Sequence, residues 1–390
     1  LAAAPERDLA LLREALATAG FGRERLAERL AFTELPVQRL RLLPAYRAAA
    51  PADTLDTLVR LFLTGVPVPR AAAAEALRPL ALENLEALQV IQPREGGVAA
   101  LIRFVPVADL LLAHDPPEIA HHAGAPRDTV PGLTNSTTTV LECTVRSRIE
   151  EFLDLGTGMG VQALAAARHS TRVTGTDFCA RALDFARFNA RLNGITNVEF
   201  VGGDRFEPVR GRRFGRIVSN PPFLISPGGR YLYRDGGLEA DGFCRSIVRQ
   251  APELLEEGGL AQYCAEWIHP KGGDWRERLL EWFDGIGCDV LVLRLDTRSP
   301  SRYADEWIRE TEGDDPAVWA PLYDRYLAYY EELGVEAVSS GVINLRKRSG
   351  ARNRVRFDDV VSQRLAPVGA WIELACELGD ALEALGHPQR

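Results

Sequence analysis

The sequence predicts an α/β fold, with a mostly parallel sheet in the second half of the chain and a helical domain before it. Between Glu151 and Phe223, four short apolar runs end in Gly, Asp or Asn, and helical segments separate the first three. Such runs are typical of strands buried on both faces of a parallel sheet. Polar residues at their carboxyl ends are typical of a sheet that binds a ligand along that edge.

The first run is followed by a glycine turn. Gly156, Gly158 and Gly160 precede a helix predicted over 161–167. Glycines allow a tight turn and close approach of a ligand to the backbone, while the helix N-terminus offers free N–H groups. The spacing G-x-G-x-G differs from the G-x-G-x-x-G of dinucleotide-binding enzymes. Asp154, just before the turn, also favours a cationic ligand over a pyrophosphate.

Three more strand ends carry polar or aromatic residues. Asp177 ends the second run, where its carboxylate is placed to accept hydrogen bonds from two ribose hydroxyls, and Asp204 ends the third, within reach of an adenine amino group. The fourth run ends in Asn220-Pro-Pro-Phe223. Two prolines cannot continue a central strand, so the chain turns there across the sheet edge.

These motifs resemble those of class I S-adenosylmethionine-dependent methyltransferases, from about residue 129 to residue 349, and the resemblance implies a Rossmann-like sheet. It also implies that Asp154 and the glycines hold the methionine part of the cofactor, Asp177 the ribose, Phe178 the adenine face and Asp204 the adenine edge. The expected cofactor-binding set is Asp154, Gly156, Thr157, Gly158, Gly160, Asp177, Phe178, Gly203, Asp204, Arg205 and Asn220. The structural alternative is a glycine-rich turn with strand-end aspartates as helix caps.

The fourth motif is similar to the acceptor clamp of N-methyltransferases, which implies that Asn220, Pro221, Pro222 and Phe223 are the catalytic residues. In those enzymes the asparagine side chain and the following proline carbonyl accept hydrogen bonds from a planar NH2, and the aromatic ring stacks on its plane. Positioning of this kind contributes most of the catalysis. A strand terminator with a buried phenylalanine is the structural alternative.

The acceptor remains open between two classes of macromolecule. An exocyclic amine of a nucleic-acid base, in RNA more than in DNA, suits the phenylalanine. A protein glutamine amide, for example in a translation factor, suits the loop 235–242, which resembles that of release-factor glutamine methyltransferases. A winged-helix regulator that senses a nucleotide is the non-enzymatic alternative, and a nicotinamide oxidoreductase is disfavoured by the glycine spacing.

We expect four segments along the chain. Residues 1–114 are predicted to form a helical, winged-helix-like domain that ends in a glycine-tipped hairpin with a strand over 98–105, and residues 115–131 a linker. Residues 132–350 are predicted to form the methyltransferase domain, and residues 351–390 a C-terminal helical extension.

Four further segments are candidates for function. Hydroxyl-bearing residues 132–139 are expected to cap a helix over 140–148 or to line the cofactor pocket, and the glycine-rich loop 228–242 lies next to the acceptor motif. Residues 301–333 form an aromatic helical insertion, interpreted as core packing with a substrate lid as the alternative. A basic cluster is the best candidate for phosphate contact and consists of Arg346, Lys347, Arg348, Arg352, Arg354 and Arg356.

Composition limits the remaining possibilities. A net charge of −8 argues against bulk coating of nucleic acid. The sequence has no run of about 18 apolar residues and no export signal over 1–7, so we expect a cytoplasmic protein without a membrane span. The six cysteines are scattered, as expected in a reducing compartment, and no set of histidines and cysteines predicts a metal site.

Overall fold

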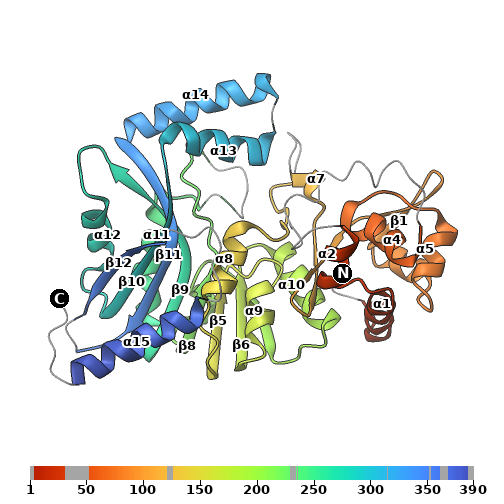
Figure 1. Cartoon of the computed structure of the whole chain (residues 1–390), viewed down its shortest axis with the longest axis horizontal. Helices are drawn as coiled ribbons and strands as arrows, with labels where there is room; N and C mark the ends of the chain where they lie inside the picture. Colours follow the sequence, from red (N-terminus) through yellow and green to blue (C-terminus); the bar gives the residue numbers. More distant parts are fainter. Residues whose placement is uncertain are drawn as a thin grey trace.

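The computed structural model describes residues 4–30, 52–120, 126–228, 234, 236–313, 315–350, 353–360 and 368–384. An eight-stranded sheet organises the fold, in the order β12-β10-β11-β9-β8-β5-β6-β7 (Figure 1). Its strands are β5 (Ile149–Leu155), β6 (Ser170–Asp177), β7 (Val198–Gly202), β8 (Phe214–Ser219), β9 (Leu255–Pro270), β10 (Cys288–Arg298), β11 (Val335–Lys347) and β12 (Val355–Asp359).

The sheet is mostly parallel, as the sequence predicts. β11 alone in this sheet runs antiparallel to its neighbours, β9 and β10. The carboxyl ends of β5, β6, β7 and β8 therefore meet along one edge. The strands are buried on both faces because successive side chains point to opposite sides: Phe152 and Val218 pack on one layer, Leu153 and Ile217 on the other.

Helices cover both faces of the sheet. One layer contains α8 (Asn135–Cys143), α9 (Val161–Ala166), α10 (Ala180–Leu192) and α15 (Gly369–Ala384), and the other contains α11 (Gly242–Gln250) and α12 (Trp275–Phe283). Short 3-10 turns, η3 (Glu207–Val209) and η4 (Ala251–Glu253), precede β8 and β9. Two further helices, α13 (Pro300–Glu312) and α14 (Pro316–Glu332), stand at the upper end of the sheet in Figure 1.

The N-terminal part contains helices, then two hairpins and a last short helix. The helical segments are α1 (Glu6–Thr18), α2 (Arg23–Arg29), α4 (Thr54–Leu58), the π-helix η2 (Val59–Thr64), α5 (Arg70–Ala76), α6 (Leu82–Ala87) and α7 (Pro117–Ala120). The hairpins pair β1 (Ile91–Arg94) with β2 (Gly97–Ala100), and β3 (Arg103–Val107) with β4 (Leu110–His114). Residues 31–51 lie outside the described residues, and the winged-helix interpretation remains a prediction.

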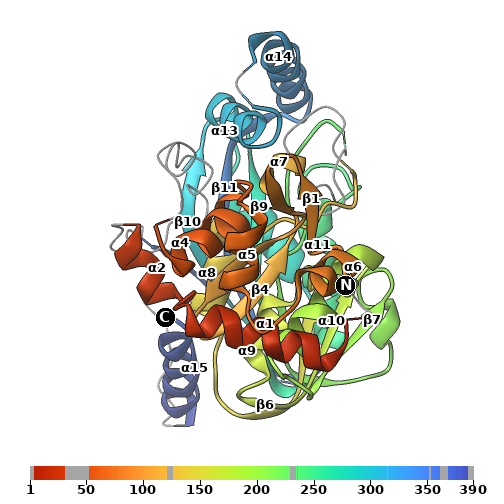
Figure 2. The same cartoon turned by 90° about the vertical axis from the view of Figure 1, so that its right-hand side faces the viewer.

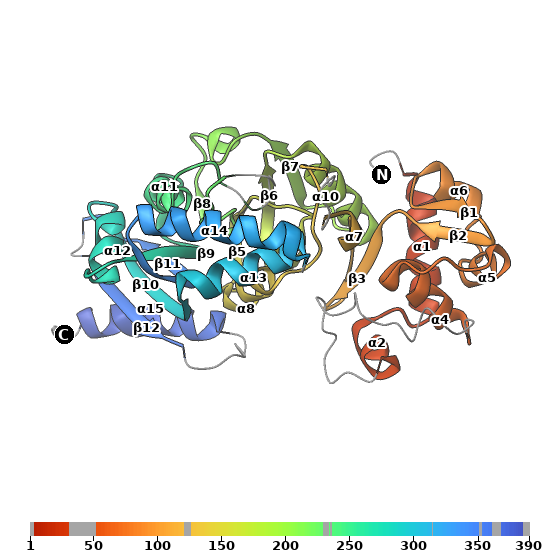
Figure 3. The ribbon, with the colours of Figure 1, turned by 90° about the horizontal axis from the view of Figure 1, so that it is seen from above.

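The N-terminal domain packs against the β7 end of the sheet, beside α10 (Figures 2 and 3). One apolar cluster joins the two parts: Phe104 of β3 stacks on Phe188 of α10, with ring centroids 6.4 Å apart and planes inclined by 29°. The two domains therefore share a hydrophobic core.

Three predicted segments differ in extent. The strand predicted over 98–105 is divided into β2 and β3, because the chain leaves β1 after Ala100 and pairs with β4 from Arg103. The helix predicted over 140–148 is α8, which begins at Asn135 because the Thr134 hydroxyl caps it by accepting from the Thr137 N–H at 3.2 Å. The segment predicted as a helical extension includes β12, an edge strand of the sheet, before α15.

Candidate functional site

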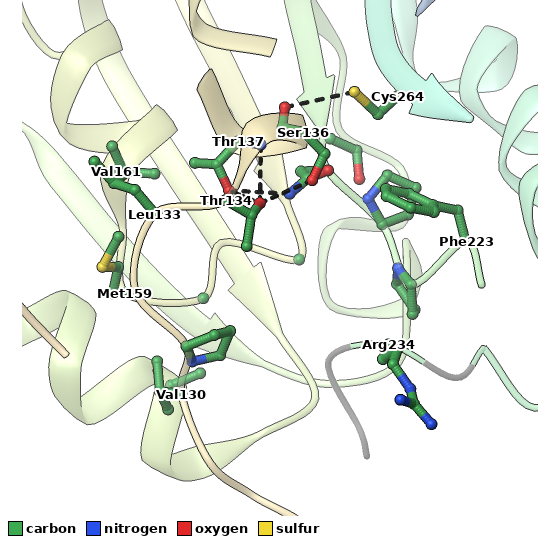
Figure 4. Close-up of a pocket in the computed structure, with 18 of the residues that line it drawn as sticks. Val130, Leu133, Thr134, Ser136, Thr137, Met159, Val161, Phe223, Arg234 and Cys264 are labelled. Atoms are coloured by element: carbon green, nitrogen blue, oxygen red, sulfur yellow. Dashed lines mark hydrogen bonds between the residues drawn. The ribbon is translucent and has the colours of Figure 1, made fainter. Parts of the chain in front are cut away.

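A cavity of about 760 Å³ lies at the carboxyl edge of β5, β6 and β8 (Figure 4). All the predicted cofactor and acceptor residues line it except Gly160, which lies next to Met159 and Val161 of its wall. The set that lines it is Asp154, Gly156, Thr157, Gly158, Asp177, Phe178, Gly203, Asp204, Arg205, Asn220, Pro221, Pro222 and Phe223. The fold thus brings together four motifs that are separated by up to 69 positions in the chain.

The glycine turn leaves open space beside its backbone. Gly156, Gly158 and Gly160 adopt φ values of 72°, 54° and 91°, in the left-handed region that favours glycine. A Cβ atom added at Gly156 or Gly158 would meet nothing within 4 Å, whereas one at Gly160 would lie 3.2 Å from the Cβ of Ala186. The first two glycines therefore leave room for a ligand against the backbone, and the third allows α10 to pack closely.

Asp154 holds the turn with one carboxylate oxygen and leaves the other unpaired. Its side chain is 1% exposed, and Oδ2 accepts from the Thr157 hydroxyl at 2.6 Å and the Ala163 N–H at 3.0 Å. Oδ1 is buried and has no partner among the described residues. Burial raises the pKa of Asp154 to about 7, against the lowering effect of these two hydrogen bonds. A cationic ligand group would favour the charged form and pair with the free oxygen.

Asp177 organises the same turn from the end of β6. Its Oδ2 accepts from the Gly158 N–H at 2.9 Å, and its Oδ1 accepts from the Cys179 N–H at 2.8 Å. Burial raises the pKa of Asp177 above its ordinary value. A carboxylate has about four acceptor positions, so both oxygens retain capacity for ligand hydroxyls. The neighbouring Phe178 ring is 70% exposed at the cavity wall, where an apolar ligand face would cover it.

The end of β7 carries an ion pair that sequence reasoning did not expect. The Arg205 guanidinium donates to both oxygens of Asp204, with Nη2–Oδ2 at 2.9 Å. Asp204 therefore lines the cavity as the acidic partner of an ion pair with Arg205. Its carboxylate keeps acceptor positions for an amino group, because this arginine occupies only one side of it.

The acceptor motif presents an unsatisfied amide oxygen. Asn220 Nδ2 donates to the Thr137 hydroxyl at 3.2 Å, while Oδ1 is buried without a partner among the described residues. Phe223 lies on the same wall (Figure 4), and its ring centroid is 6.2 Å from that of Trp307 of α13. An amide oxygen with free acceptor capacity beside an aromatic ring suits a flat group that carries N–H donors.

Hydroxyl groups at the N-terminus of α8 line the cavity. Thr134 Oγ1 lies 2.8 Å from both the Ser136 and the Thr137 hydroxyl oxygens, and all three residues line the cavity (Figure 4). The sequence left open whether these residues cap the helix or line the pocket. The structure shows that Thr134 does both.

Two buried tyrosines hold the chain immediately after the acceptor motif. The Tyr303 hydroxyl accepts from the Ile225 N–H at 3.2 Å, and the Tyr330 hydroxyl donates to the Ile225 carbonyl at 2.8 Å. Tyr303 also donates to Glu266, which pairs with Arg298 at 2.7 Å. Burial raises the pKa of Glu266 to about 7. These tyrosines of the aromatic insertion therefore pack as core. They also hold in place the acceptor loop, which is the Asn220–Phe223 motif and the residues up to Ile225.

Three members of the predicted phosphate-contact cluster are paired with acidic side chains. Arg346 pairs with Asp380 at 2.7 Å, Arg348 with Asp289 at 3.1 Å, and Arg356 with Asp358 at 2.7 Å. None of the described members of the cluster lines the cavity, and Arg352 lies outside the described residues. Acidic side chains contributed by β10, β12 and α15 neutralise these arginines, and the linear sequence could not reveal that pairing.

The loop after the acceptor motif is described only in part. Arg234 is buried and lines the cavity (Figure 4). Tyr231, Tyr233 and Asp235, which are also candidates for substrate contact in this loop, lie outside the described residues. At its end Asp241 is buried, and it accepts from the Ile268 N–H at 3.0 Å.

The N-terminal domain supplies part of the cavity wall, which the sequence did not predict. Leu63 and Thr64 of η2 and Arg103, Phe104 and Val105 of β3 all line it. No motif marks these residues, because they reach the cavity only through docking of the two domains. Within the residues that the structure describes, no group of three His, Cys, Asp or Glu side chains is arranged to hold a metal ion, and no helix has the length and apolar character to span a membrane.

Two family models match the chain. Residues 132–266 match the family described as methyltransferase small domain, which confirms the predicted class of domain over that segment. Residues 18–101 match a family described as a domain of unknown function (DUF7059). The sheet edge, the glycine turn and the Asn220 motif all lie inside the first match.

Curated relatives share the methyltransferase region. The chain is 38% identical over 121 residues to the release factor glutamine methyltransferase of Xylella fastidiosa, a match that covers 27% of this chain and 43% of the relative. It is 32% identical over 148 residues to the ribosomal RNA small subunit methyltransferase C of Alcanivorax borkumensis, covering 38% and 39%. It is also 34% identical over 126 residues to the ribosomal protein uL3 glutamine methyltransferase of Bradyrhizobium diazoefficiens, covering 29% and 40%. The chain thus spans less than half of the length of each.

Among solved structures, a methyltransferase from Pyrococcus furiosus aligns with a TM-score of 0.34 and 18% identity. The alignment covers 55% of this chain and 82% of that protein.

Proposed function

We propose that this chain is an S-adenosylmethionine-dependent N-methyltransferase that methylates a planar NH2 group, with an exocyclic amine of an RNA base as acceptor. The observation that carries the proposal is Asn220, which lines the cavity with Phe223 and whose buried Oδ1 has no partner within the described part of the chain. A buried amide oxygen without a partner is costly, so a ligand N–H is the natural complement. The match of residues 132–266 to the methyltransferase small domain supports the same activity.

The cofactor side of the cavity fits S-adenosylmethionine. Asp154 offers a buried, unpaired carboxylate oxygen for an ammonium group, and Gly156 and Gly158 leave backbone space beside it. Asp177 and Phe178 are assigned to the ribose and the adenine face, and Asp204 to the adenine edge. When bound, this cofactor supplies a methyl group that is already activated for transfer.

The chain's own contribution to the reaction is positioning. Asn220 Oδ1 and the Pro221 carbonyl are assigned to the two N–H bonds of the acceptor, and Phe223 to its flat face. Holding both N–H groups in plane leaves the nitrogen lone pair directed out of that plane. Tyr303 and Tyr330 keep this loop in place through the backbone of Ile225. The loop therefore needs little further ordering when the acceptor binds.

A protein glutamine amide is the second candidate acceptor. Two of the three relatives described above are named as glutamine methyltransferases, one for a release factor and one for ribosomal protein uL3. The ion pairs of Arg346, Arg348 and Arg356 also favour this acceptor, because they leave these three arginines less available for phosphate contact. The amide group of glutamine has the same flat NH2 geometry as a base amine.

Transfer of a tritiated methyl group to separated RNA and protein fractions of a cell extract tests the proposal. The wild-type enzyme is expected to label RNA, and label in protein alone assigns the glutamine class. The Asn220→Ala variant is expected to lose about a hundredfold or more in transfer rate while binding S-adenosylhomocysteine with nearly unchanged affinity. Asn353, which is exposed and remote from the cavity, gives the matched control Asn353→Ala. Loss of cofactor binding in Asn220→Ala would assign that residue to the turn structure instead.

A further inference from the structure

Trp307 presents an unpaired donor in the cavity wall. It lies on α13, the helix that follows β10 directly at the carboxyl edge of the sheet, and it lines the cavity. Its indole Nε1 is buried and has no hydrogen-bond partner among the described residues. Buried tryptophan N–H groups usually find a partner, because an unpaired one loses its bond to water without replacement. A donor of this kind on a cavity wall indicates a ligand acceptor atom.

The ring geometry limits how Trp307 meets an acceptor. The planes of Trp307 and Phe223 are inclined by 64°, with centroids 6.2 Å apart. A flat group stacked on Phe223 lies parallel to that ring, so its plane crosses the Trp307 plane at the same steep angle. Trp307 therefore cannot stack on the face of such a group. The N–H bond of an indole lies in the ring plane, so an edge contact would bring this donor to the group.

The position of Trp307 is fixed by its own helix. Its backbone carbonyl accepts from the Thr311 hydroxyl at 2.8 Å, and its ring packs edge-to-face on Tyr303, with centroids 6.3 Å apart. Tyr303 is in turn held by Glu266 and by the Ile225 N–H. Tyr303 therefore contacts both Trp307 and the acceptor loop, and it fixes their positions relative to each other.

We propose that Trp307 is a positioning residue that selects acceptors by donating its indole N–H to an atom bonded to the carbon that carries the NH2 group. This inference rests on the proposed function and defines its substrate class. Asn220 Oδ1 accepts from the NH2 group and Trp307 donates to the neighbouring atom. Together the two residues recognise a substrate that carries a hydrogen-bond donor and an acceptor on adjacent atoms. Amide oxygens and the ring nitrogens next to exocyclic amines of bases supply that pair. An alkyl amine such as a lysine side chain lacks the acceptor atom.

The Trp307→Phe variant tests this reading because it keeps an aromatic ring and removes only the N–H. With tritiated S-adenosylmethionine and whichever fraction, RNA or protein, the wild type labels, kcat/KM is expected to fall about tenfold, mainly through KM, as for one hydrogen bond to a buried donor. Affinity for S-adenosylhomocysteine is expected to stay unchanged. Trp307→His, which restores a ring N–H, is expected to recover part of the loss.

The matched control is Trp319→Phe. The Trp319 indole N–H is also buried without a partner among the described residues, but Trp319 lies on α14, stacks on Tyr323 and does not line the cavity. Its replacement is expected to leave kcat/KM unchanged. Equal kcat/KM in Trp307→Phe and the wild type, or an equal loss in both variants, overturns the inference and leaves the proposed function standing. A wild type that binds S-adenosylhomocysteine and labels neither fraction overturns both.

Discussion

At the scale of single residues, the proposed contact of Asp154 with the cofactor predicts a link between cofactor affinity and pH. Burial raises its pKa to about 7, so the carboxyl group of the ligand-free protein is protonated below that pH. An ammonium group requires the charged form. Binding therefore has to remove a proton from Asp154 in acidic solution, and this costs free energy that increases as the pH falls.

We expect the affinity for S-adenosylhomocysteine to increase from pH 6 to pH 8, by up to about tenfold for each pH unit below the pKa. Asp154→Asn, which cannot ionise, is expected to bind more weakly at pH 8 and to show a flatter pH profile. Calorimetry in two buffers of different ionisation enthalpy measures both the affinity and the proton released at pH 6. Equal wild-type affinity at pH 6 and pH 8 would exclude an ionic role for Asp154.

The places of the proposed cofactor-binding residues at the cavity were predictable, because each place depends on local sequence. Asp154 stands two positions before its glycine, and Asp177 stands at a strand end, so spacing alone places both at the edge of the sheet. Trp307 was not predictable in this way. It follows Phe223 by more than eighty positions, and its own segment reads as an aromatic helix face that suits core packing equally well.

At the scale of elements, α13 and α14 support the acceptor loop. Their buried tyrosines pack with Leu224 and Ile225 in one cluster, and two hydroxyls occupy both backbone groups of Ile225. The core interpretation of the aromatic insertion is therefore correct for Tyr326 and Tyr330, and Tyr303 is buried beside them. The sequence could not show which strand or loop the insertion covers, because helix periodicity defines a face and not its partner.

Tyr330→Phe is expected to reduce the free energy of unfolding by about 1–3 kcal/mol, because it leaves the buried Ile225 carbonyl without a donor. Amides of residues 223–225 are expected to exchange faster with solvent, and methyl transfer to slow more than cofactor binding weakens. Tyr323→Phe on the same helix is the control, since the Tyr323 hydroxyl has no hydrogen-bond partner in the described part of the chain. Denaturant unfolding and hydrogen exchange test the pair, and equal destabilisation of both variants would contradict the support role.

At the scale of the whole molecule, α10 fastens the N-terminal domain to the sheet. Asn189 exchanges two hydrogen bonds with the backbone of Ala113, at 2.7 and 3.0 Å, and donates to the Met159 carbonyl in the glycine turn at 2.9 Å. Asn193 repeats the pattern one turn later with Leu111, at 2.8 Å in both directions. Asp115, in the segment predicted as a linker, pairs with Arg181 of α10 at 2.9 Å. The docked arrangement depends on these long-range contacts, which local sequence patterns do not encode.

Asn189→Ala is expected to destabilise the protein by about 3 kcal/mol or more, since it leaves three buried backbone groups unpaired. It is also expected to weaken cofactor binding, because one of those groups belongs to Met159. The exposed Asn84, which bonds Asp8 within the N-terminal domain at 3.1 Å, provides the control Asn84→Ala. Scanning calorimetry with and without S-adenosylhomocysteine measures both effects. An unchanged melting temperature in Asn189→Ala would show that the hydrogen bonds of Asn189 do not hold the N-terminal part against the sheet.

The composition of the cavity wall also has a consequence for biosynthesis. Its lining begins at Leu63 in the N-terminal domain and ends at Gly341 in β11, so the first and last contributions are separated by most of the chain. A nascent chain that has emerged only through the glycine turn still lacks the α13 and β11 walls. The complete cavity therefore forms only on a nearly complete chain. A ligand that contacts both the early and the late parts of the wall should accordingly give its full protection from proteolysis only late in synthesis.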